Sequence, residues 1–163
     1  MKVTLISAVA RGNVIGTGNG GIPWSMPRDV EHFRSYTAGK ALLLGRVTYQ
    51  EMLGWFSDHF PIVLSRSSAL QVERGALVGS VPAAIELASP RGELVVCGGG
   101  EIYAAAMPYA TDVILTQIDA DIAGSVYFPE MEPKEWASVS SEAFPADDSH
   151  AHAMTIQHLS RKR

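Results

Sequence analysis

Short apolar runs alternate with amphipathic segments along most of the chain, and this pattern predicts alternating strands and helices. The runs predicted as strands are residues 2–9, 40–45, 61–65, 76–79, 93–97 and 112–118. Helices are expected from Pro27 to near Gly39, around 46–52 with Thr48 as its cap, from Ser80 or Val81 to 88, and over 101–107. Two last strands, at about 137–143 and 151–159, read as a long hairpin across a turn rich in Asp and Ser.

Strands that alternate with helices indicate an α/β fold with a mostly parallel sheet. The closing hairpin predicts an antiparallel edge. We find no internal repeat, linker or low-complexity segment, so residues 1–163 are expected to form a single domain.

Composition narrows the classes of partner. The chain is 47% hydrophobic and 18% charged, with a formal net charge of −4, so no basic stripe points to nucleic acid. No apolar segment reaches the length of a membrane span. The apolar residues 1–10 are interpreted as a first core strand instead of a signal peptide. The lone Cys97 excludes an internal disulfide, and we expect a cytoplasmic protein.

A glycine-rich loop over 12–21 leads into the helix that begins at Pro27, and Asp29 lies in the first turn of that helix. Two interpretations of Asp29 stay open. Aspartate is common in any first turn, where it meets the positive end of the helix dipole. Alternatively, because Asp29 borders the apolar face that includes Phe33, it is a desolvated acid at a pocket.

Three predicted strands end in polar or glycine-rich turns. Gly98-Gly99-Gly100 directly follows a buried strand, which suits either a phosphate site or a tight strand-to-helix turn. Arg46 with Thr48, and Ser65 with Arg66, follow two other strands. Two arginines and several hydroxyls at neighbouring strand ends fit a 2′-phosphate, which favours NADP over NAD.

The remaining histidines and the lone cysteine do not indicate a metal site or a catalytic nucleophile. His150, His152 and His158 have the spacing of one strand face, and no carboxylate or cysteine pattern completes a set of metal ligands, so no metal is expected. Cys97 follows a buried strand and is interpreted as a packing residue. No nucleophile elbow appears.

Taken together, the motifs resemble those of bacterial dihydrofolate reductase across essentially the whole chain. The resemblance rests on matching segments in the same order: Ile22-Pro23-Trp24 with Asp29, Gly45-Arg46 with Thr48, Leu64-Ser65-Arg66, Gly98 to Tyr103, and Leu115-Thr116 with Ile118-Asp119 and Phe128-Pro129. It implies a three-layer fold with an eight-stranded, mostly parallel sheet and four flanking helices.

The resemblance also implies NADPH as cofactor and dihydrofolate, or a related pterin, as substrate. The residues implied in catalysis are Asp29, Trp24 and Thr116. Those implied in substrate binding are Ile6, Ser7, Val30, Phe33, Met52, Phe56, Cys97 and Tyr103. Those implied in cofactor binding are Ala8, Ile15, Gly16, Gly45, Arg46, Val47, Thr48, Leu64, Ser65, Arg66, Cys97, Gly98, Gly99, Gly100, Glu101, Ile102 and Tyr103. The family joins the first two glycines by a cis peptide and uses the loop around 16–22 as a lid.

Reduction of a C=N bond needs a hydride on carbon and a proton on nitrogen. The resemblance assigns the hydride to NADPH, and the proton to water assisted by Asp29. We expect a monomer that binds neither nucleic acid nor membrane, and that is a target for antifolates.

Several positions depart from the family pattern. His59 stands where an arginine usually grips the glutamate tail of folate, Ser125 stands where Asp is common, and Ile22 stands where Met is frequent. A neutral imidazole makes no bidentate carboxylate contact. Three readings of His59 stay open: weak dihydrofolate binding, a tail held elsewhere, or a substrate without the tail. The altered segment 52–60 also raises the hypothesis of weaker diaminopyrimidine binding. The competing functions are a reductase of another pterin or of a riboflavin-pathway pyrimidine, and a non-catalytic nucleotide-binding module.

Overall fold

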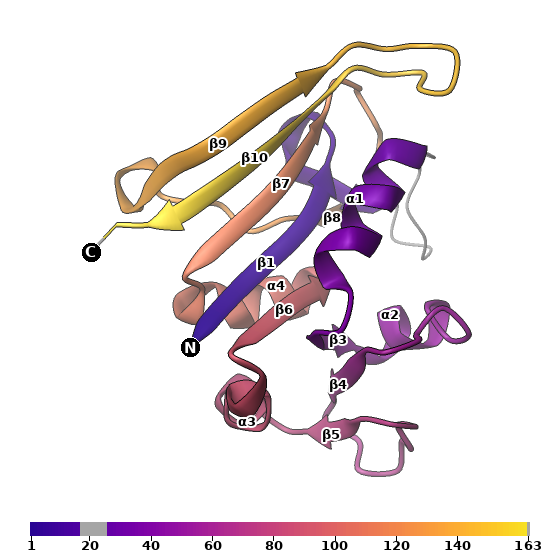
Figure 1. Ribbon diagram of the computed structural model, residues 1–163, viewed down its shortest axis with the longest axis vertical. Coiled ribbons are helices and arrows are strands. Elements are labelled where there is room, and N and C mark those ends of the chain that lie inside the picture. The colour runs from indigo at the N-terminus through magenta and orange to yellow at the C-terminus, as the bar shows by residue number, and fades with distance from the viewer. Residues whose placement is uncertain (17–25, 163) are drawn as a thin grey trace.

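Eight strands form the main sheet of the computed structural model, which describes residues 1–16 and 26–162 (Figure 1). The strand order is β5-β4-β3-β6-β1-β7-β10-β9. The strands are β1 (Lys2–Val9), β3 (Ala41–Gly45), β4 (Phe60–Leu64), β5 (Ala76–Val78), β6 (Glu93–Gly98), β7 (Asp112–Ile118), β9 (Trp136–Phe144) and β10 (Met154–Arg161). Strand β10 runs antiparallel to both of its neighbours, β7 and β9, whereas all other neighbouring strands described in this sheet pair in parallel. The predicted mostly parallel sheet with an antiparallel C-terminal strand is confirmed.

Among the described residues, four α-helices cover the sheet on its two faces, as expected. They are α1 (Pro27–Thr37), α2 (Arg46–Glu51), α3 (Val81–Ala88) and α4 (Gly100–Ala106). Short 3-10 turns lie at η1 (Arg11–Asn13), η2 (Ser89–Arg91), η3 (Met107–Tyr109) and η4 (Pro133–Glu135). Side chains alternate across the strands: Leu42 and Leu44 pack toward α1 and α2, whereas Leu43 packs toward α3 and α4.

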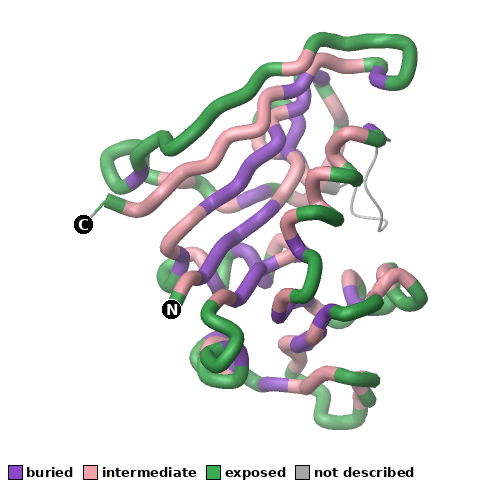
Figure 2. Tube along the Cα trace, in the orientation of Figure 1, coloured by how far each residue is buried: buried purple, intermediate pink, exposed green. Residues whose placement is uncertain are grey.

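The central strands are buried on both faces, which explains their continuous apolar sequences (Figure 2). Every residue of Ala41–Leu44 in β3 is inaccessible to solvent. The edge strand β9 is exposed along most of its length, where it carries the polar residues Ser138, Ser140, Ser141 and Glu142. Among the described residues, no helix is long and apolar enough to cross a membrane.

Three local expectations are wrong or need refinement. The first half of the glycine-rich loop forms a short strand, β2 (Val14–Gly16), which pairs with β8 (Val126–Tyr127), so two strands were missed. Helix α2 has Gly45 as its N-cap and starts at Arg46, so Thr48 lies inside the helix instead of capping it. Ser80 does cap α3, and its hydroxyl accepts the Ala83 N–H at 3.2 Å.

The C-terminal histidines do not share a strand face. Strand β10 begins at Met154, so it includes His158 but neither His150 nor His152. His150 instead closes a tight turn with Asp147, because the two residues exchange backbone hydrogen bonds of 3.0 and 3.1 Å.

Candidate active site

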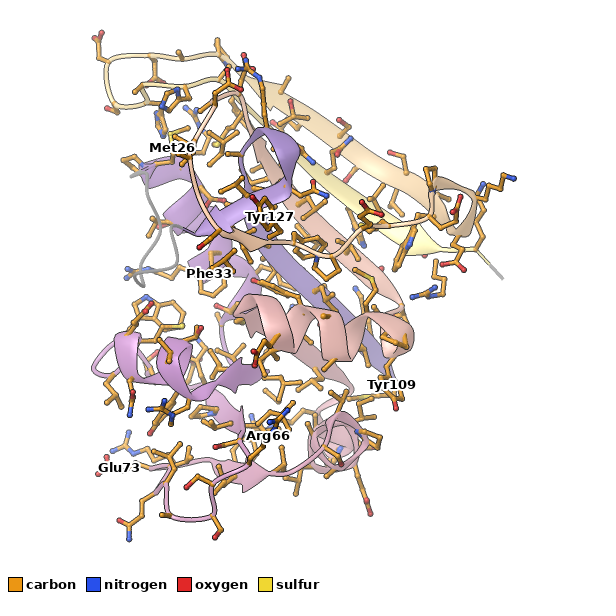
Figure 3. The ribbon with its side chains drawn as sticks, turned by 180° about the vertical axis from the view of Figure 1, so that it is seen from behind. Met26, Phe33, Arg66, Glu73, Tyr109 and Tyr127 are labelled. Atoms are coloured by element: carbon orange, nitrogen blue, oxygen red, sulfur yellow. The ribbon has the colours of Figure 1, made fainter. Side chains whose placement is uncertain are left out.

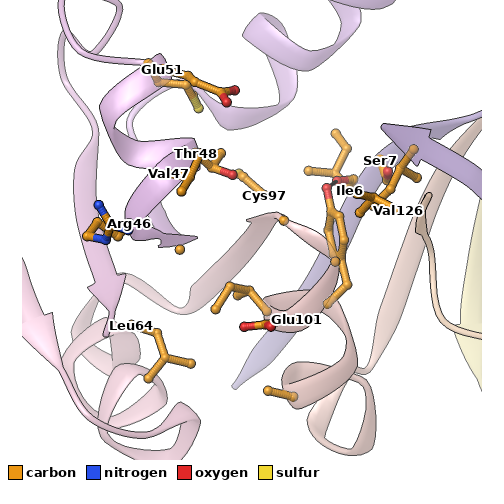
Figure 4. A pocket seen from close by; sticks show the side chains of 18 of the residues that line it. Ile6, Ser7, Arg46, Val47, Thr48, Glu51, Leu64, Cys97, Glu101 and Val126 are labelled. Atoms are coloured by element: carbon orange, nitrogen blue, oxygen red, sulfur yellow. Dashed lines mark hydrogen bonds between the residues drawn. The ribbon is translucent and has the colours of Figure 1, made fainter. Parts of the chain in front are cut away.

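A cavity of about 1300 Å³ opens at the carboxyl ends of β1, β3, β4 and β6, between α1, α2 and α4. Ligands of open α/β sheets bind at this position, because the strand-to-helix turns there point backbone donors into a shared space. Figure 4 shows the α2 wall on one side of the cavity and the β1 and β8 side chains on the other. The labelled residues on these walls are Arg46, Val47, Thr48, Ile6, Ser7 and Val126.

Asp29 reaches the cavity from the first turn of α1. Burial raises the pKa of its carboxyl group; a hydrogen bond from the Thr116 hydroxyl and the nearby His32 oppose this shift without cancelling it. Thr116, on the fully buried face of β7, is itself only 1% exposed. The interpretation of Asp29 as a solvated residue of the first helical turn is therefore wrong. Its carboxyl group is partly desolvated, and neighbouring groups shift its pKa.

His32 lies beside Asp29 on the same face of α1, one turn further along, and also lines the cavity. Burial lowers the pKa of its imidazole, and the Asp29 charge opposes that shift. Its Nε2 atom is buried and has no hydrogen-bond partner among residues 1–16 and 26–162. His32 was not among the residues expected at the site, although its spacing of three residues from Asp29 places both on one face of the helix.

The turn from β6 to α4 holds the backbone close to the cavity. The Gly98–Gly99 peptide is cis, as the resemblance implied. Gly98 has φ +110°, and a Cβ atom there would meet the Tyr103 ring at 3.1 Å, so only glycine fits without strain. The Tyr103 hydroxyl donates to the Ile6 carbonyl oxygen at 2.6 Å, which ties α4 to β1. Burial raises the pKa of the Cys97 thiol, so this side chain stays protonated and unreactive.

The other end of the cavity collects cationic and hydroxyl groups. Arg46 and Thr48 come from α2, and Ser65, Arg66 and Ser67 come from the turn after β4. The Ser65 hydroxyl accepts the Ser67 N–H at 3.1 Å, which shapes this turn. Two guanidinium groups with several hydroxyls are a donor set for phosphate groups. The cavity thus has a partly buried acid at one end and a cationic wall at the other.

Most of the expected site residues meet in this cavity. The members that line it are Ile6, Ser7, Ala8, Ile15, Asp29, Val30, Phe33, Gly45, Arg46, Val47, Thr48, Met52, Leu64, Ser65, Arg66, Cys97, Gly99, Gly100, Glu101, Ile102 and Tyr103. Gly16 pairs with Val126, and Gly98 and Thr116 support the wall from behind. Trp24 and most of the expected lid fall outside the described residues.

Trp55, not Phe56, supplies the aromatic wall of the cavity in this part of the chain. Phe56 instead packs its ring on Tyr49, with centroids 5.7 Å apart. Trp55 packs against Phe33 with ring centroids 5.5 Å apart and was not among the expected residues. Glu51, Ser67, Gly79 and Val126 also line the cavity without having been expected.

His59 is buried beneath this aromatic wall. Its ring stacks on Trp55 with centroids 4.6 Å apart, and its Nδ1 accepts the Ser57 N–H at 3.1 Å. Burial lowers the pKa of the imidazole, against the opposing effect of Asp58, so the ring is neutral near pH 7. Its Nε2 is a buried donor with no partner in the described part of the chain.

Metal binding finds no support among the described residues, which contain no cluster of three or more potential ligands. His158 pairs with Asp112 at 2.7 Å, and His150 contacts the start of α1.

Comparison with known proteins matches this architecture to one family. The family model described as dihydrofolate reductase matches residues 2–161. The chain is 36% identical over 163 residues to dihydrofolate reductase type 3 of Salmonella typhimurium, covering 100% of both. It is 35% identical over 137 residues to dihydrofolate reductase of Neisseria gonorrhoeae, covering 83% of this chain and 84% of that one. A structure of dihydrofolate reductase from Enterococcus faecalis, complexed with NADP(H) and RAB-propyl, superimposes with a TM-score of 0.90 at 26% identity, covering 99% of this chain and 97% of the other. The chain therefore belongs to the dihydrofolate reductase family.

Proposed function

We propose that the protein reduces 7,8-dihydrofolate to tetrahydrofolate with NADPH, adding hydride to C6 and a proton to N5. The observation that carries this proposal is the pairing, in one cavity, of the acid Asp29 with a wall bearing Arg46 and Arg66. A C=N reduction needs a proton source near the substrate and a binding site for a phosphorylated hydride donor, and this cavity provides both.

The donor set of the cationic wall fits NADPH, which supplies the hydride when bound. Arg46 and Thr48 would hold its pyrophosphate, and Ser65 with Arg66 would hold the 2′-phosphate. Gly99 and Gly100 line the cavity without side chains, so the cofactor could approach the backbone closely there. Together these residues would orient the bound cofactor.

Asp29 binds the 2-amino group and the adjacent ring nitrogen of the pterin, and Thr116 fixes the carboxylate for that contact. The apolar wall formed by Ile6, Val30 and Phe33 excludes water from the reacting carbon. The proton is proposed to reach N5 through water assisted by Asp29; Trp24, also expected to take part in catalysis, lies outside the described residues. Protonation makes the C=N carbon a better hydride acceptor.

The neutral ring of His59 supports weaker recognition of the substrate tail than a guanidinium gives. A comparison of dihydrofolate with a tail-less dihydropterin measures this effect. We expect the KM values of the two substrates to differ by less than about tenfold, which corresponds to about 1.4 kcal/mol. The reason is that a neutral His59 cannot form an ion pair with the carboxylate of the glutamate tail.

We also propose a cytoplasmic monomer with no nucleic-acid or membrane partner and with antifolates as inhibitors. The net charge of −4 supports the absence of a nucleic-acid partner, and the single cysteine supports a cytoplasmic location. The cavity supports the binding of antifolates. The divergent segment 52–60 is proposed to bind diaminopyrimidines more weakly than ordinary bacterial members of the family do; an inhibition constant like theirs would contradict this.

The test is a coupled assay of NADPH oxidation with dihydrofolate, using the native protein and Asp29→Asn. Asparagine keeps the shape but cannot supply or stabilise the proton, so we expect kcat to fall about 100- to 1000-fold near pH 7. The NADPH dissociation constant should not change. Absence of turnover by the native protein, or full activity of Asp29→Asn, contradicts the proposal.

A further inference from the structure

The tip of the β9–β10 hairpin contacts the start of α1, although the two segments lie far apart in sequence (Figure 1). Nε2 of His150, in the hairpin tip, lies 3.0 Å from the backbone nitrogen of Arg28. The imidazole is well shielded, with 6% of the side chain exposed. Arg28 immediately precedes Asp29, so this contact acts on the turn that carries the acid of the cavity.

The contact supplies a hydrogen bond that α1 cannot make by itself. Met26, the N-cap residue, provides no side-chain cap, and Pro27 has no N–H. The Arg28 N–H is therefore the first donor of the helix, and the His150 ring accepts it. A ring nitrogen that accepts cannot carry a proton, so the proton lies on Nδ1 and is donated to Asp147 Oδ1 at 2.7 Å.

Asp147 fixes the ring in this tautomer. Oδ1 of Asp147 also accepts the Ser149 N–H at 2.9 Å, and Oδ2 of Asp147 lies 3.5 Å from Nη2 of Arg28. That guanidinium also covers the Phe144 ring at 4.6 Å from its centroid. Backbone and side chain of Arg28 are thus both held by the hairpin.

Met26, which precedes Pro27 and Arg28, is also held in place. Met26 (Figure 3) is 2% exposed and packs with Ile118 at the end of β7, with Ala120 just after it and with Met154 at the start of β10. The start of α1 consequently has three attachments: the apolar packing of Met26, the contact of His150 with the Arg28 backbone, and the contacts of the Arg28 side chain with Asp147 and Phe144. Only the second fixes the direction of the Arg28 N–H, and with it the backbone of Asp29.

We propose that His150 is a positioning residue for Asp29: its ring holds the first turn of α1 so that the carboxylate faces the pterin side of the cavity. The inference rests on the proposed function, because it concerns the residue that binds the substrate there. His150 touches neither substrate nor cofactor.

The test compares His150→Ala with His150→Gln, using His152→Ala in the same hairpin as a matched control. Glutamine places an amide oxygen the same number of bonds from Cα as Nε2, so it can accept the Arg28 N–H. We expect His150→Ala to raise the dihydrofolate KM about tenfold, since small misplacement of a positioning group costs up to about 100-fold. His150→Gln should stay within about threefold of the native KM, and the NADPH dissociation constant should change less than about twofold in all variants.

Amide hydrogen exchange gives a second measure that does not depend on activity. We expect exchange at Arg28 and Asp29 to accelerate about tenfold or more in His150→Ala, but not in His150→Gln, because the open helix end frays. Should His150→Ala not fold, Asp147→Ala serves instead. That change frees Nδ1, lets the proton move to Nε2 and removes the acceptor, with the same expected direction in KM.

The outcomes separate the two proposals. No NADPH oxidation by the native protein contradicts the proposed function, whatever the variants do. Normal native turnover with an unchanged KM and unchanged exchange in His150→Ala overturns the role of His150 alone. An equal loss in His150→Ala and His150→Gln, or a parallel loss of NADPH affinity, also overturns it, because either result indicates general structural damage.

Discussion

At the scale of single residues, the environment of Asp29 decides its chemistry. Burial raises the pKa of the carboxyl group, and the Thr116 hydroxyl partly offsets this by donating to the charged form. A carboxyl group with a raised pKa keeps its proton to higher pH. The rate that depends on this proton should then fall as pH rises through the raised pKa.

Thr116→Val tests this balance while keeping the volume of the side chain nearly constant. Without the hydroxyl, the charged form loses a hydrogen bond, so the pKa of Asp29 rises further. We expect the falling limb of kcat against pH to move to higher pH, as measured by steady-state kinetics. Asp29→Asn should abolish that limb. A shift to lower pH in Thr116→Val contradicts this account.

Arg66 is the residue we expect to select NADPH over NADH. It is exposed at the cationic wall and is the second residue after β4. Arg66→Ala should raise the KM for NADPH about 10- to 100-fold, because a hydrogen bond to a charged group contributes about 1.5–3 kcal/mol. The KM for NADH should not change. Arg34→Ala, an exposed arginine of α1 outside the cavity, is the control; equal effects on both cofactors would refute the assignment.

At the scale of elements, a polar cluster joins α1, β1 and β6 away from the cavity. The Glu93 carboxylate accepts from Tyr36 at 2.5 Å and from Thr4 at 2.7 Å, and Lys40 lies 3.2 Å away. Burial by itself raises the pKa of Glu93, but the hydrogen bonds from Tyr36, Thr4 and Lys40 outweigh it, and the pKa is lowered. The cluster therefore stabilises the fold in its charged form.

Glu93→Gln should lower the free energy of unfolding near pH 7 by about 1–3 kcal/mol, because a half-buried network loses its charge. The folded pKa lies below the ordinary value of 4.5, so this stabilisation is complete above that value and is lost as pH falls through the folded pKa. Urea titrations across pH measure it. The native protein and the variant should converge in acid, whereas Glu142→Gln on the exposed edge strand should change little.

At the scale of the whole molecule, one sheet runs from β5 to β9, with both helical layers packed on it. We expect residues 1–163 to unfold as one unit, with coincident near- and far-ultraviolet circular dichroism transitions.

NADPH at about 100 times its dissociation constant should raise the free energy of unfolding by about 2.7 kcal/mol and the Tm by roughly 5–10 °C. Two separate transitions, or no change with NADPH, would contradict a single domain with one cofactor cavity.

The sequence by itself determined the local structure and the inventory of chemical groups. Short, nearly continuous apolar runs placed β1 and β7 with their correct limits. The Pro27 start, and a start expected at Ser80 or Val81, located two helices. These signals are legible because helix caps and strand periodicity depend on neighbouring residues. The motif set at three strand ends likewise supplied most of the cavity lining.

Only the tertiary structure decided which distant residues meet. Strand β2 exists because it pairs with β8, a contact that no local pattern of Val14–Gly16 contains. Trp55 rather than Phe56 faces the cavity because the loop packs His59 and Tyr49 beneath it. The burial of Asp29 by neighbours on other elements, and the His150 contact at its helix start, are set in the same way. The physical reason is that burial, and with it pKa, depends on non-local packing, which periodicity along one segment does not encode.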